Sequence, residues 1–240
     1  MLDEQDKAYA ATVARNKKFR AWLVEDSTSR ALLVNGYNDE VSDFESPFSF
    51  LCAQVITMFE HTDSALVVSF FCRCHTGYDD SLIAPGATGL ISSLAGQLIS
   101  QMQSKGVSPD LSFLDDEDCH RIKRGDIDTL CFLFRKLVLQ LPREKILICA
   151  LDEISLYESP DKRAETDRVM NELSRLLRRE PNAVVKLLVT CLGQSLEAHQ
   201  YFDERDIIHV EERPERDTSG SWNLGSAQGD AYDFDQYLTE

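Results

Sequence analysis

Four nearly continuous apolar runs, each of strand length, alternate with helical segments along this chain and limit what it can fold into. The runs are "RALLVNG" (30–36), "ALVVSFFC" (65–72), "KILICALDE" (145–153) and "AVVKLLVTCL" (183–192), with a shorter fifth, "DIIHV" (206–210). Runs of this kind are typical of strands that are covered on both faces. Because strands that alternate with helices form parallel sheets, the sequence predicts an α/β domain with helices on both faces.

The segments between these runs have helical spacing. Residues 4–24 carry a stripe that predicts one lead-in helix, with Tyr9, Val13, Phe19, Trp22 and Leu23 on or near it. Ser46-Pro47 and Ser159-Pro160 each predict a helix start, because Ser is a favoured N-cap and Pro suits the first helical position. A loose acidic stretch is expected at 108–118, before the apolar helix of "DIDTLCFLFRKLVLQLP".

These elements predict a single domain with a short segment on each side. Residues 1–28 form the lead-in helix, 29–210 form the α/β domain, and 211–240 are polar and acidic. We expect this last segment to be a disordered tail, although its aromatic residues among acids also suit a docking segment.

Charge and cysteine content narrow the classes of function. The formal net charge is -16, which argues against a nucleic-acid or anionic-membrane surface, since both reward clustered Lys and Arg. "MLDEQDK" is too charged for a secretory signal, and no apolar run approaches the ~20 residues that cross a bilayer. The seven cysteines lie mostly in apolar runs, which indicates buried free thiols and a cytoplasmic protein. Cys72-Arg73-Cys74-His75 lacks the spacing of a zinc site.

Polar residues at the ends of two strands are the candidate chemistry, because ligands of open parallel sheets bind beyond the carboxyl ends of the strands. Asp152 and Glu153 end the third run. An apolar strand followed by Asp-Glu is the Walker B arrangement of phosphate-loop ATPases, in which the Asp holds Mg²⁺ and the Glu polarises the attacking water. Thr190 ends the fourth run, where it suits a sensor of the γ-phosphate or simply the end of a strand.

The order of the segments resembles the NACHT-type domains of fungal STAND signalling NTPases, a class that includes the nephrocystin-type N-terminal P-loop domain. The resemblance covers about residues 18–210 and is carried by "FRAWLVEDSTSRALLVNG", "LVVSFFC", "LISSLAGQLI", "LCFLFRKLVLQLP", "ILICALDEISLYE" and "KLLVTC". It implies a P-loop NTPase-like, three-layer αβα sandwich with a five-stranded, mostly parallel sheet in the order 5-1-4-3-2. It also implies Asp152-Glu153 on the third strand and Thr190 at the end of the fourth.

The phosphate loop is where this chain departs from that family. Such a loop needs a second Gly, a Lys for the β/γ-phosphates and a Ser or Thr for Mg²⁺. Counted from Gly36, those three positions hold Val41, Ser42 and Asp43. No Lys lies between 19 and 104, and four carboxylates occupy the loop: Asp39, Glu40, Asp43 and Glu45. Each would oppose a phosphate charge by roughly 1 to 2 kcal/mol at about 8 to 10 Å.

Several readings of this region stay open. The backbone N–H groups at the Ser46 helix start are the remaining candidates for a phosphate contact, together with Gly36, Ser42 and Thr190. "NDEVSDFE" has oxygen ligands for Ca²⁺ but lacks the Gly and the cadence of a calcium loop.

The sequence therefore predicts a non-catalytic pseudo-NTPase domain of NACHT-like fold, with no cofactor, which acts through protein contacts in signalling or regulation. The alternative is a working STAND-type ATPase or GTPase switch, with Asp152 and Glu153 as its catalytic pair and Asp152 on Mg²⁺. The family usually joins this domain to an effector and to repeats, neither of which this chain contains, so an adaptor or decoy role is expected. We expect the partner to be a protein rather than a nucleic acid or a membrane, and the sequence does not indicate which protein.

Overall fold

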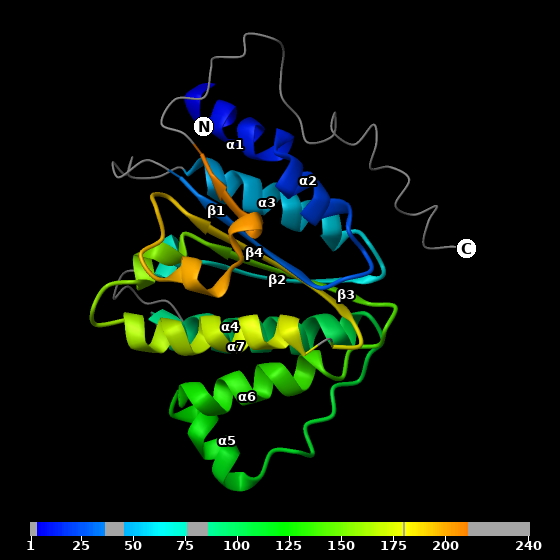
Figure 1. Ribbon diagram of the computed structural model, residues 1–240. Helices are drawn as coiled ribbons and strands as arrows, with labels where there is room; N and C mark the ends of the chain where they lie inside the picture. Colours follow the sequence, from blue (N-terminus) through cyan, green and yellow to red (C-terminus); the bar gives the residue numbers. More distant parts are fainter. Residues whose placement is uncertain (1–3, 37–45, 76–85, 180, 211–240) are drawn as a thin grey trace.

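A parallel five-stranded sheet runs through the computed structural model, which describes residues 4–36, 46–75, 86–179 and 181–210 (Figure 1). Its strands are β1 (Arg30–Asn35), β2 (Ala65–Phe71), β3 (Ile146–Asp152), β4 (Val184–Cys191) and β5 (Ile207–His209). They lie in the order β2-β3-β4-β1-β5, and every pairing is parallel. The predicted strand order is thus confirmed, and the carboxyl ends of all five strands meet at one edge.

Helices cover both faces of this sheet, so the predicted three-layer αβα sandwich is confirmed (Figure 1). One face carries α1 (Glu4–Arg15), α2 (Lys17–Val24) and α3 (Pro47–Glu60). The other carries α4 (Gly86–Ser104), α6 (Ile127–Val138) and α7 (Arg163–Arg178), with α5 (Asp116–Lys123) lying farther out. None of the described helices combines the length and the apolarity that a membrane-spanning helix needs.

Two apolar clusters, one on each face, make up the core of the domain. Successive strand residues point to opposite faces, so Leu33 and Leu187 join one cluster while Leu32 and Leu188 join the other. This explains why the strand runs are continuously apolar rather than alternating. All seven cysteines are free thiols, five of them buried, as their place in apolar runs predicted.

The lead-in segment forms two helices, so the prediction of one continuous helix over 4–24 is wrong. Asn16 breaks it, because its side chain accepts a hydrogen bond from the Lys18 N–H at 2.8 Å and starts α2 as an N-cap. Val13 and Trp22 are fully buried in the same cluster as Leu32 and Val34 of β1. These helices therefore supply part of the core on their face of the sheet.

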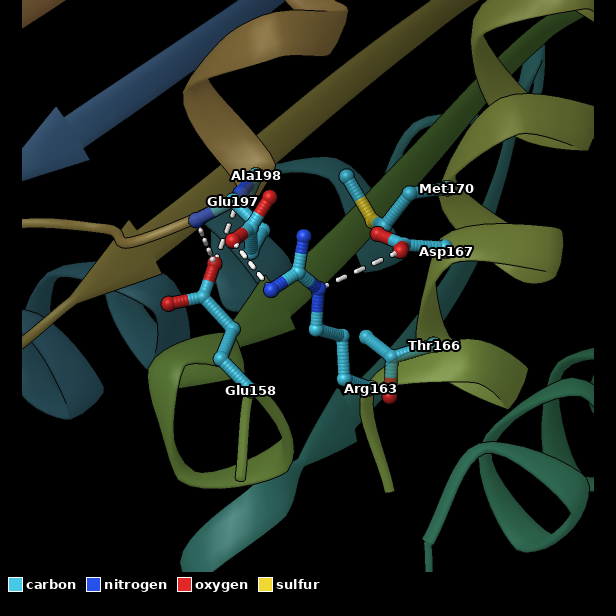
Figure 2. A pocket seen from close by; sticks show the side chains of 7 residues that line it. All are labelled: Glu158, Arg163, Thr166, Asp167, Met170, Glu197 and Ala198. Carbon is cyan, nitrogen blue, oxygen red and sulfur yellow. Dashed lines mark hydrogen bonds and ion pairs between the residues drawn. The ribbon is translucent and has the colours of Figure 1, made fainter. Parts of the chain in front are cut away.

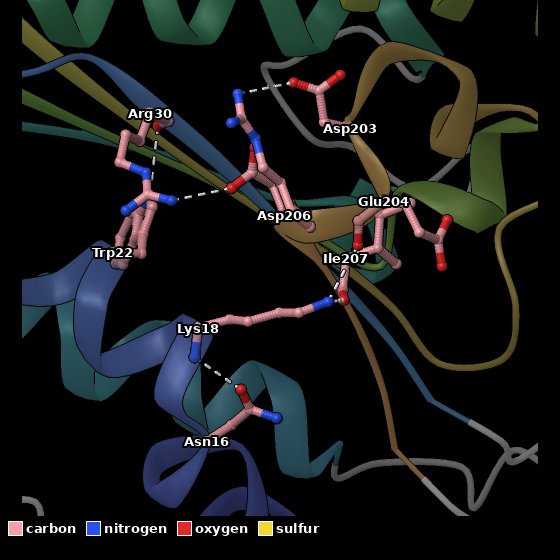
Figure 3. Close-up of polar contacts among 9 residues, drawn as sticks. Asn16, Lys18, Trp22, Arg30, Asp203, Glu204, Asp206 and Ile207 are labelled. Carbon is pink, nitrogen blue, oxygen red and sulfur yellow. Dashed lines mark hydrogen bonds and ion pairs between the residues drawn. The ribbon is translucent and has the colours of Figure 1, made fainter.

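Lysine side chains hold α2 to the sheet. Figure 3 shows Lys18, whose Nζ donates to the carbonyl oxygens of Ile207 and Glu204 at 2.7 and 3.0 Å. From the opposite direction, Nζ of Lys186 on β4 donates to the carbonyl oxygens of Trp22 and Leu23 at 2.7 and 2.9 Å. The indole N–H of Trp22 in turn donates to the Arg30 carbonyl at 3.3 Å.

Two local expectations differ from the structure. Ser159-Pro160 does not open α7: the carbonyl of Ser159 accepts from the N–H groups of Lys162 and Arg163 in a turn, and the helix begins at Arg163. The acidic stretch, expected to be loose, leads into α5, where Asp115 and Asp118 form a reciprocal capping box. Acids in the first turn favour a helix through its dipole, which explains why this polar segment is helical.

Candidate functional site at the carboxyl ends of the strands

Asp152, the last residue of β3, lies between hydroxyl groups from two other elements. Oγ1 of Thr190 on β4 donates to its Oδ1 at 2.6 Å, and Oγ of Ser49 on α3 donates to its Oδ2. The Thr190 hydroxyl also accepts the N–H of Glu153 at 3.0 Å. The structure thus brings together Asp152, Glu153 and Thr190, and adds Ser49, which the count from Gly36 did not select.

Glu153 is fully buried and forms a two-point ion pair with Arg73. Nε and Nη2 of Arg73 donate to Oε2 and Oε1 of Glu153 at 2.7 and 3.0 Å. Arg73 belongs to the 3₁₀ turn Cys72–His75, which directly follows β2. Glu153 itself has left-handed backbone angles, φ 55° and ψ 46°, which are uncommon for a residue with a side chain. An ion pair of this geometry neutralises a carboxylate that would otherwise be costly to bury.

Burial controls the ionisation of this cluster. Desolvation raises the pKa of Asp152 to about 6, although the hydrogen bonds from Ser49 and Thr190 act in the opposite direction. One turn beyond Ser49, burial raises the pKa of the Cys52 thiol well above its usual value, and the nearby Asp152 adds to the shift. Cys52 is therefore a protonated core residue, and the ionised form of Asp152 is disfavoured.

The start of α3 faces this cluster. Ser46 is buried and is the N-cap of α3, as predicted, with its Oγ accepting the Ser49 N–H at 3.4 Å. Pro47 stands at the first helical position, where it has no N–H to donate. Phe48 follows and is 2% exposed. The helix start therefore has few backbone donors to offer an anion.

Gly36 directly follows β1 and is tightly enclosed. Its N–H donates to the Cys191 carbonyl at 2.9 Å. A Cβ added at Gly36 would lie 2.0 Å from the Leu192 carbonyl oxygen and 2.6 Å from Cε2 of Phe48. The glycine is thus required by the close approach of two neighbouring segments.

The segment after β4 is held in place by Glu158, a buried residue that the sequence did not single out. Figure 2 shows its carboxylate beside the backbone of Glu197 and Ala198. It accepts the N–H groups of Leu196, Glu197 and Ala198 at 2.7, 3.0 and 2.7 Å. Nη1 of Arg163 adds an ion pair with Oε1 of Glu197 at 2.7 Å. These contacts fix the backbone of residues 196–198 after β4.

The remaining predicted residues separate into those that the structure describes and those that it does not. Ser42, with Val41, Asp43 and the proposed calcium loop, lies outside the described residues, as does the segment 211–240. The described residues contain no group of three or more His, Cys, Asp or Glu side chains suited to a metal ion, so Cys72, Cys74 and His75 do not form one. Counting forward from the helix start at Ser46-Pro47 would have found Ser49, whereas Arg73 gave no sequence signal.

The three-layer arrangement and the strand order β2-β3-β4-β1-β5 are those of a P-loop NTPase-like α/β domain. The chain belongs to the family described as "Nephrocystin 3, N-terminal", whose model matches residues 10–191. No curated protein matches the chain.

Two solved structures resemble it at low identity. The Aeropyrum pernix ORC2 protein, solved as ADPNP–ADP complexes, is 14% identical with a TM-score of 0.41, over 84% of this chain and 46% of that one. Drosophila ORC bound to AT-rich DNA and Cdc6 is 12% identical with a TM-score of 0.41, over 95% of this chain. This chain spans 66% of that second chain.

Proposed function

We propose that this chain is a pseudo-NTPase domain of NACHT-like fold, which does not hydrolyse nucleotide and acts through protein contacts in signalling or regulation. The observation that carries the proposal is the buried Phe48 ring, one residue before Ser49. The net charge of -16 further supports a protein partner over a nucleic acid.

The contact between Ser49 and Asp152 supports a different register for the phosphate loop. In a phosphate loop the Mg²⁺-binding hydroxyl residue directly follows the Lys, which directly follows a Gly. The Walker B Asp holds the same Mg²⁺, so that hydroxyl and that carboxylate lie together. Because Ser49 donates to Asp152, it is the best candidate for the hydroxyl position, in place of Asp43.

In this register the lysine position holds Phe48 and the preceding glycine position holds Pro47. A buried phenyl ring cannot neutralise a phosphate charge, and Pro47 removes a backbone donor that would otherwise point toward the phosphates. The residues present therefore do not fit a nucleoside triphosphate. The proposal keeps the prediction from the sequence that the phosphate loop lacks its lysine and its second glycine. It places these two positions at Phe48 and Pro47, at the start of α3, instead of at Ser42 and Val41.

The ion pair of Glu153 supports the absence of hydrolysis. A carboxylate that polarises a water needs an oxygen within hydrogen-bond reach of that water. Both oxygens of Glu153 accept from Arg73, and the side chain is fully buried. We therefore assign Asp152 and Glu153 a structural role at the end of β3.

The alternative, an ATPase or GTPase switch of STAND type, is favoured by one observation. Ser49, Asp152 and Thr190 keep a set of oxygen atoms of the kind that Mg²⁺ prefers. In this alternative Asp152 is the Mg²⁺ ligand and Glu153 the catalytic carboxylate.

Titration calorimetry with ATP, ADP and GTP, each with Mg²⁺, tests the proposal on the full chain. The expected dissociation constants are about millimolar or weaker, since no lysine contacts the phosphates. The matched variant Pro47→Gly/Phe48→Lys should bind at least about tenfold more tightly, because it restores the donor and the cation. Submicromolar binding by the unchanged chain would contradict the proposal.

An assay of phosphate release from ATP and GTP distinguishes the pseudo-NTPase proposal from the alternative of a working switch. If the chain is a pseudo-NTPase, Asp152→Asn and Glu153→Gln leave the release of phosphate at the background of the buffer. A measurable rate that either substitution abolishes would establish the switch instead.

A further inference from the structure

An open cleft of about 420 Å³ lies at the amino end of the sheet, away from the acid pair. Its walls are the start of β1, the last turns of α7 and the segment 200–206. This volume is within the range of about 300 to 1,000 Å³ that ligand sites occupy. No part of the proposed pseudo-NTPase site contributes to it.

Three arginines and two aspartates line the cleft. Arg30 pairs with Asp206 at 3.1 Å. Arg205 pairs with Asp203 at 3.2 Å and with Asp206 at 3.7 Å. Figure 3 labels Arg30 and the two aspartates. Arg30 and Asp206 are mostly buried, with side chains 33% and 18% exposed. Two of the arginines are thus matched by carboxylates of the chain itself.

Arg178 is the arginine that remains. Its Nη2 donates to Ser174 Oγ at 3.0 Å, and among the described residues it has no carboxylate partner. A guanidinium has five N–H donors in a planar arrangement that suits a carboxylate. Within the described part of the chain, the cleft therefore carries one positive charge that no carboxylate matches, in a protein whose net charge is -16.

An apolar wall lies beside Arg178. Leu177, Tyr201 and Phe202 line the cleft and are partly buried against the core. The Tyr201 hydroxyl donates to the carbonyl of Asp167 at 3.2 Å, so the ring rather than the hydroxyl is the surface that a ligand would meet. A ligand that fits both features has a carboxylate next to an apolar group.

We propose that this cleft binds a short segment of a partner protein in which an acidic side chain follows or precedes an apolar one, with the carboxylate on Arg178. The inference rests on the proposed function in one respect, namely that the chain acts through protein contacts. The chain's strong negative charge disfavours a polyanion, whereas a segment with one or two carboxylates meets little repulsion. The cleft also adjoins α2, since the Arg30 carbonyl accepts from Trp22.

Fluorescence anisotropy on the full chain tests this site with two labelled pentapeptide amides, Gly-Leu-Glu-Leu-Gly and Gly-Leu-Gln-Leu-Gly. The Glu peptide should bind at least about tenfold more tightly than the Gln peptide, because only its carboxylate forms a charge-assisted bond. Arg178→Gln should remove about the same factor. Arg175→Gln, at an exposed position of α7 outside the cleft, should leave the affinity unchanged.

Equal binding of the two peptides, or an Arg178→Gln variant that is folded by circular dichroism and binds normally, would overturn the proposal. So would inorganic phosphate that displaces the peptide at equal concentration, since the site would then hold any small anion. The calorimetry described above is done on the same protein, which keeps the two proposals distinct. Nucleotide binding would contradict the pseudo-NTPase role alone, and a failure of peptide binding would contradict the cleft alone.

Discussion

The two ends of the sheet each bury charged groups, and they neutralise them differently. At the carboxyl end, burial raises the pKa of Asp152 to about 6, and at the amino end it lowers the pKa of Lys186 to about 8. Hydroxyls satisfy Asp152 and a full ion pair satisfies its neighbour Glu153. Lys186 instead donates to the carbonyls of Trp22 and Leu23 in the last turn of α2 and lies 5.6 Å from the Trp22 ring, with the charges of Glu25 and Asp26 near enough to favour its ionised form.

This difference distinguishes the candidate site at the carboxyl end of the sheet from the anchor at the amino end, by which we mean the contacts of Lys186 with α2. The carboxyl-end groups come from three strand ends and the start of α3, where a P-loop NTPase-like fold places its chemistry. Nζ of Lys186 donates to two carbonyls at the C-terminal end of α2, so these hydrogen bonds attach the lead-in helices to the sheet. Buried ionisable groups thus form the candidate site at one end of the sheet and hold a helix to the sheet at the other.

The largest expected effect comes from breaking the ion pair at the carboxyl end. Arg73→Ala leaves Glu153 fully buried without its partner, and the free energy of unfolding should fall by about 3 to 5 kcal/mol. Urea denaturation measures this loss. Adding Glu153→Gln to the same variant should recover most of it, because the uncompensated charge is then absent. A loss below about 1 kcal/mol in Arg73→Ala would show that the pair contributes little.

The charge at the amino end predicts a dependence on alkaline pH. Lys186 has a folded pKa of about 8 and an ordinary value of 10.5, so its contribution to stability is present above 10.5 and is lost as the pH falls through 8. Compared with Lys186→Met, the unchanged chain should gain on the order of 3 kcal/mol between pH 8 and 10.5.

Denaturation of both proteins across this range measures the difference between them. The buried thiols titrate equally in both and cancel in the subtraction. A difference that does not vary with pH would mean that Lys186 is charged as easily in the folded protein as in the unfolded one.

The acid at the carboxyl end predicts the opposite dependence at lower pH. The folded pKa of Asp152 is about 6 and the ordinary value is 3.8, so the stability from its protonated form is present below 3.8 and is lost as the pH rises through 6. Relative to Asp152→Asn, the unchanged chain should lose about 3 kcal/mol between pH 4 and 7. Asp126 is an exposed N-cap whose pKa is lowered by its hydrogen bonds with Thr129, so its contribution to stability is lost as the pH falls. It therefore provides a control whose pH dependence has the opposite sign. Parallel profiles for the unchanged chain and Asp152→Asn would refute this assignment.

The smallest effect sharpens the description of the anchor. Lys18 also donates to two carbonyls, but it lies nearer the surface than Lys186. Lys18→Met should lower the free energy of unfolding by about 1 kcal/mol, as expected for hydrogen bonds that water can partly replace. Thermal unfolding followed by circular dichroism measures it, with Lys17→Met, which neighbours it on α2, as the control. A loss as large as that of Arg73→Ala would place Lys18 among the essential contacts.

Much of the fold could be predicted from the sequence, because strand and helix patterns are local. The runs 30–36, 145–153 and 183–192 became β1, β3 and β4, which end one residue earlier, and their order in the sheet followed from the family resemblance. The site was predicted less completely. Asp152 and Thr190 were located because they lie at the ends of apolar runs, whereas Ser49 was missed because the count began at Gly36 and assumed a loop of standard length.

The sequence by itself determined the alternation of elements, the acid pair at the end of β3 and the absence of a lysine near the loop. Only the tertiary structure decided that Arg73 reaches Glu153, eighty positions away, that Lys186 ends beneath α2, and that Phe48 is buried before Ser49. The physical reason is that strand and helix periodicity depends on neighbours in the chain. The partner of a buried charge depends instead on which elements pack together, and that arrangement is a property of the whole domain.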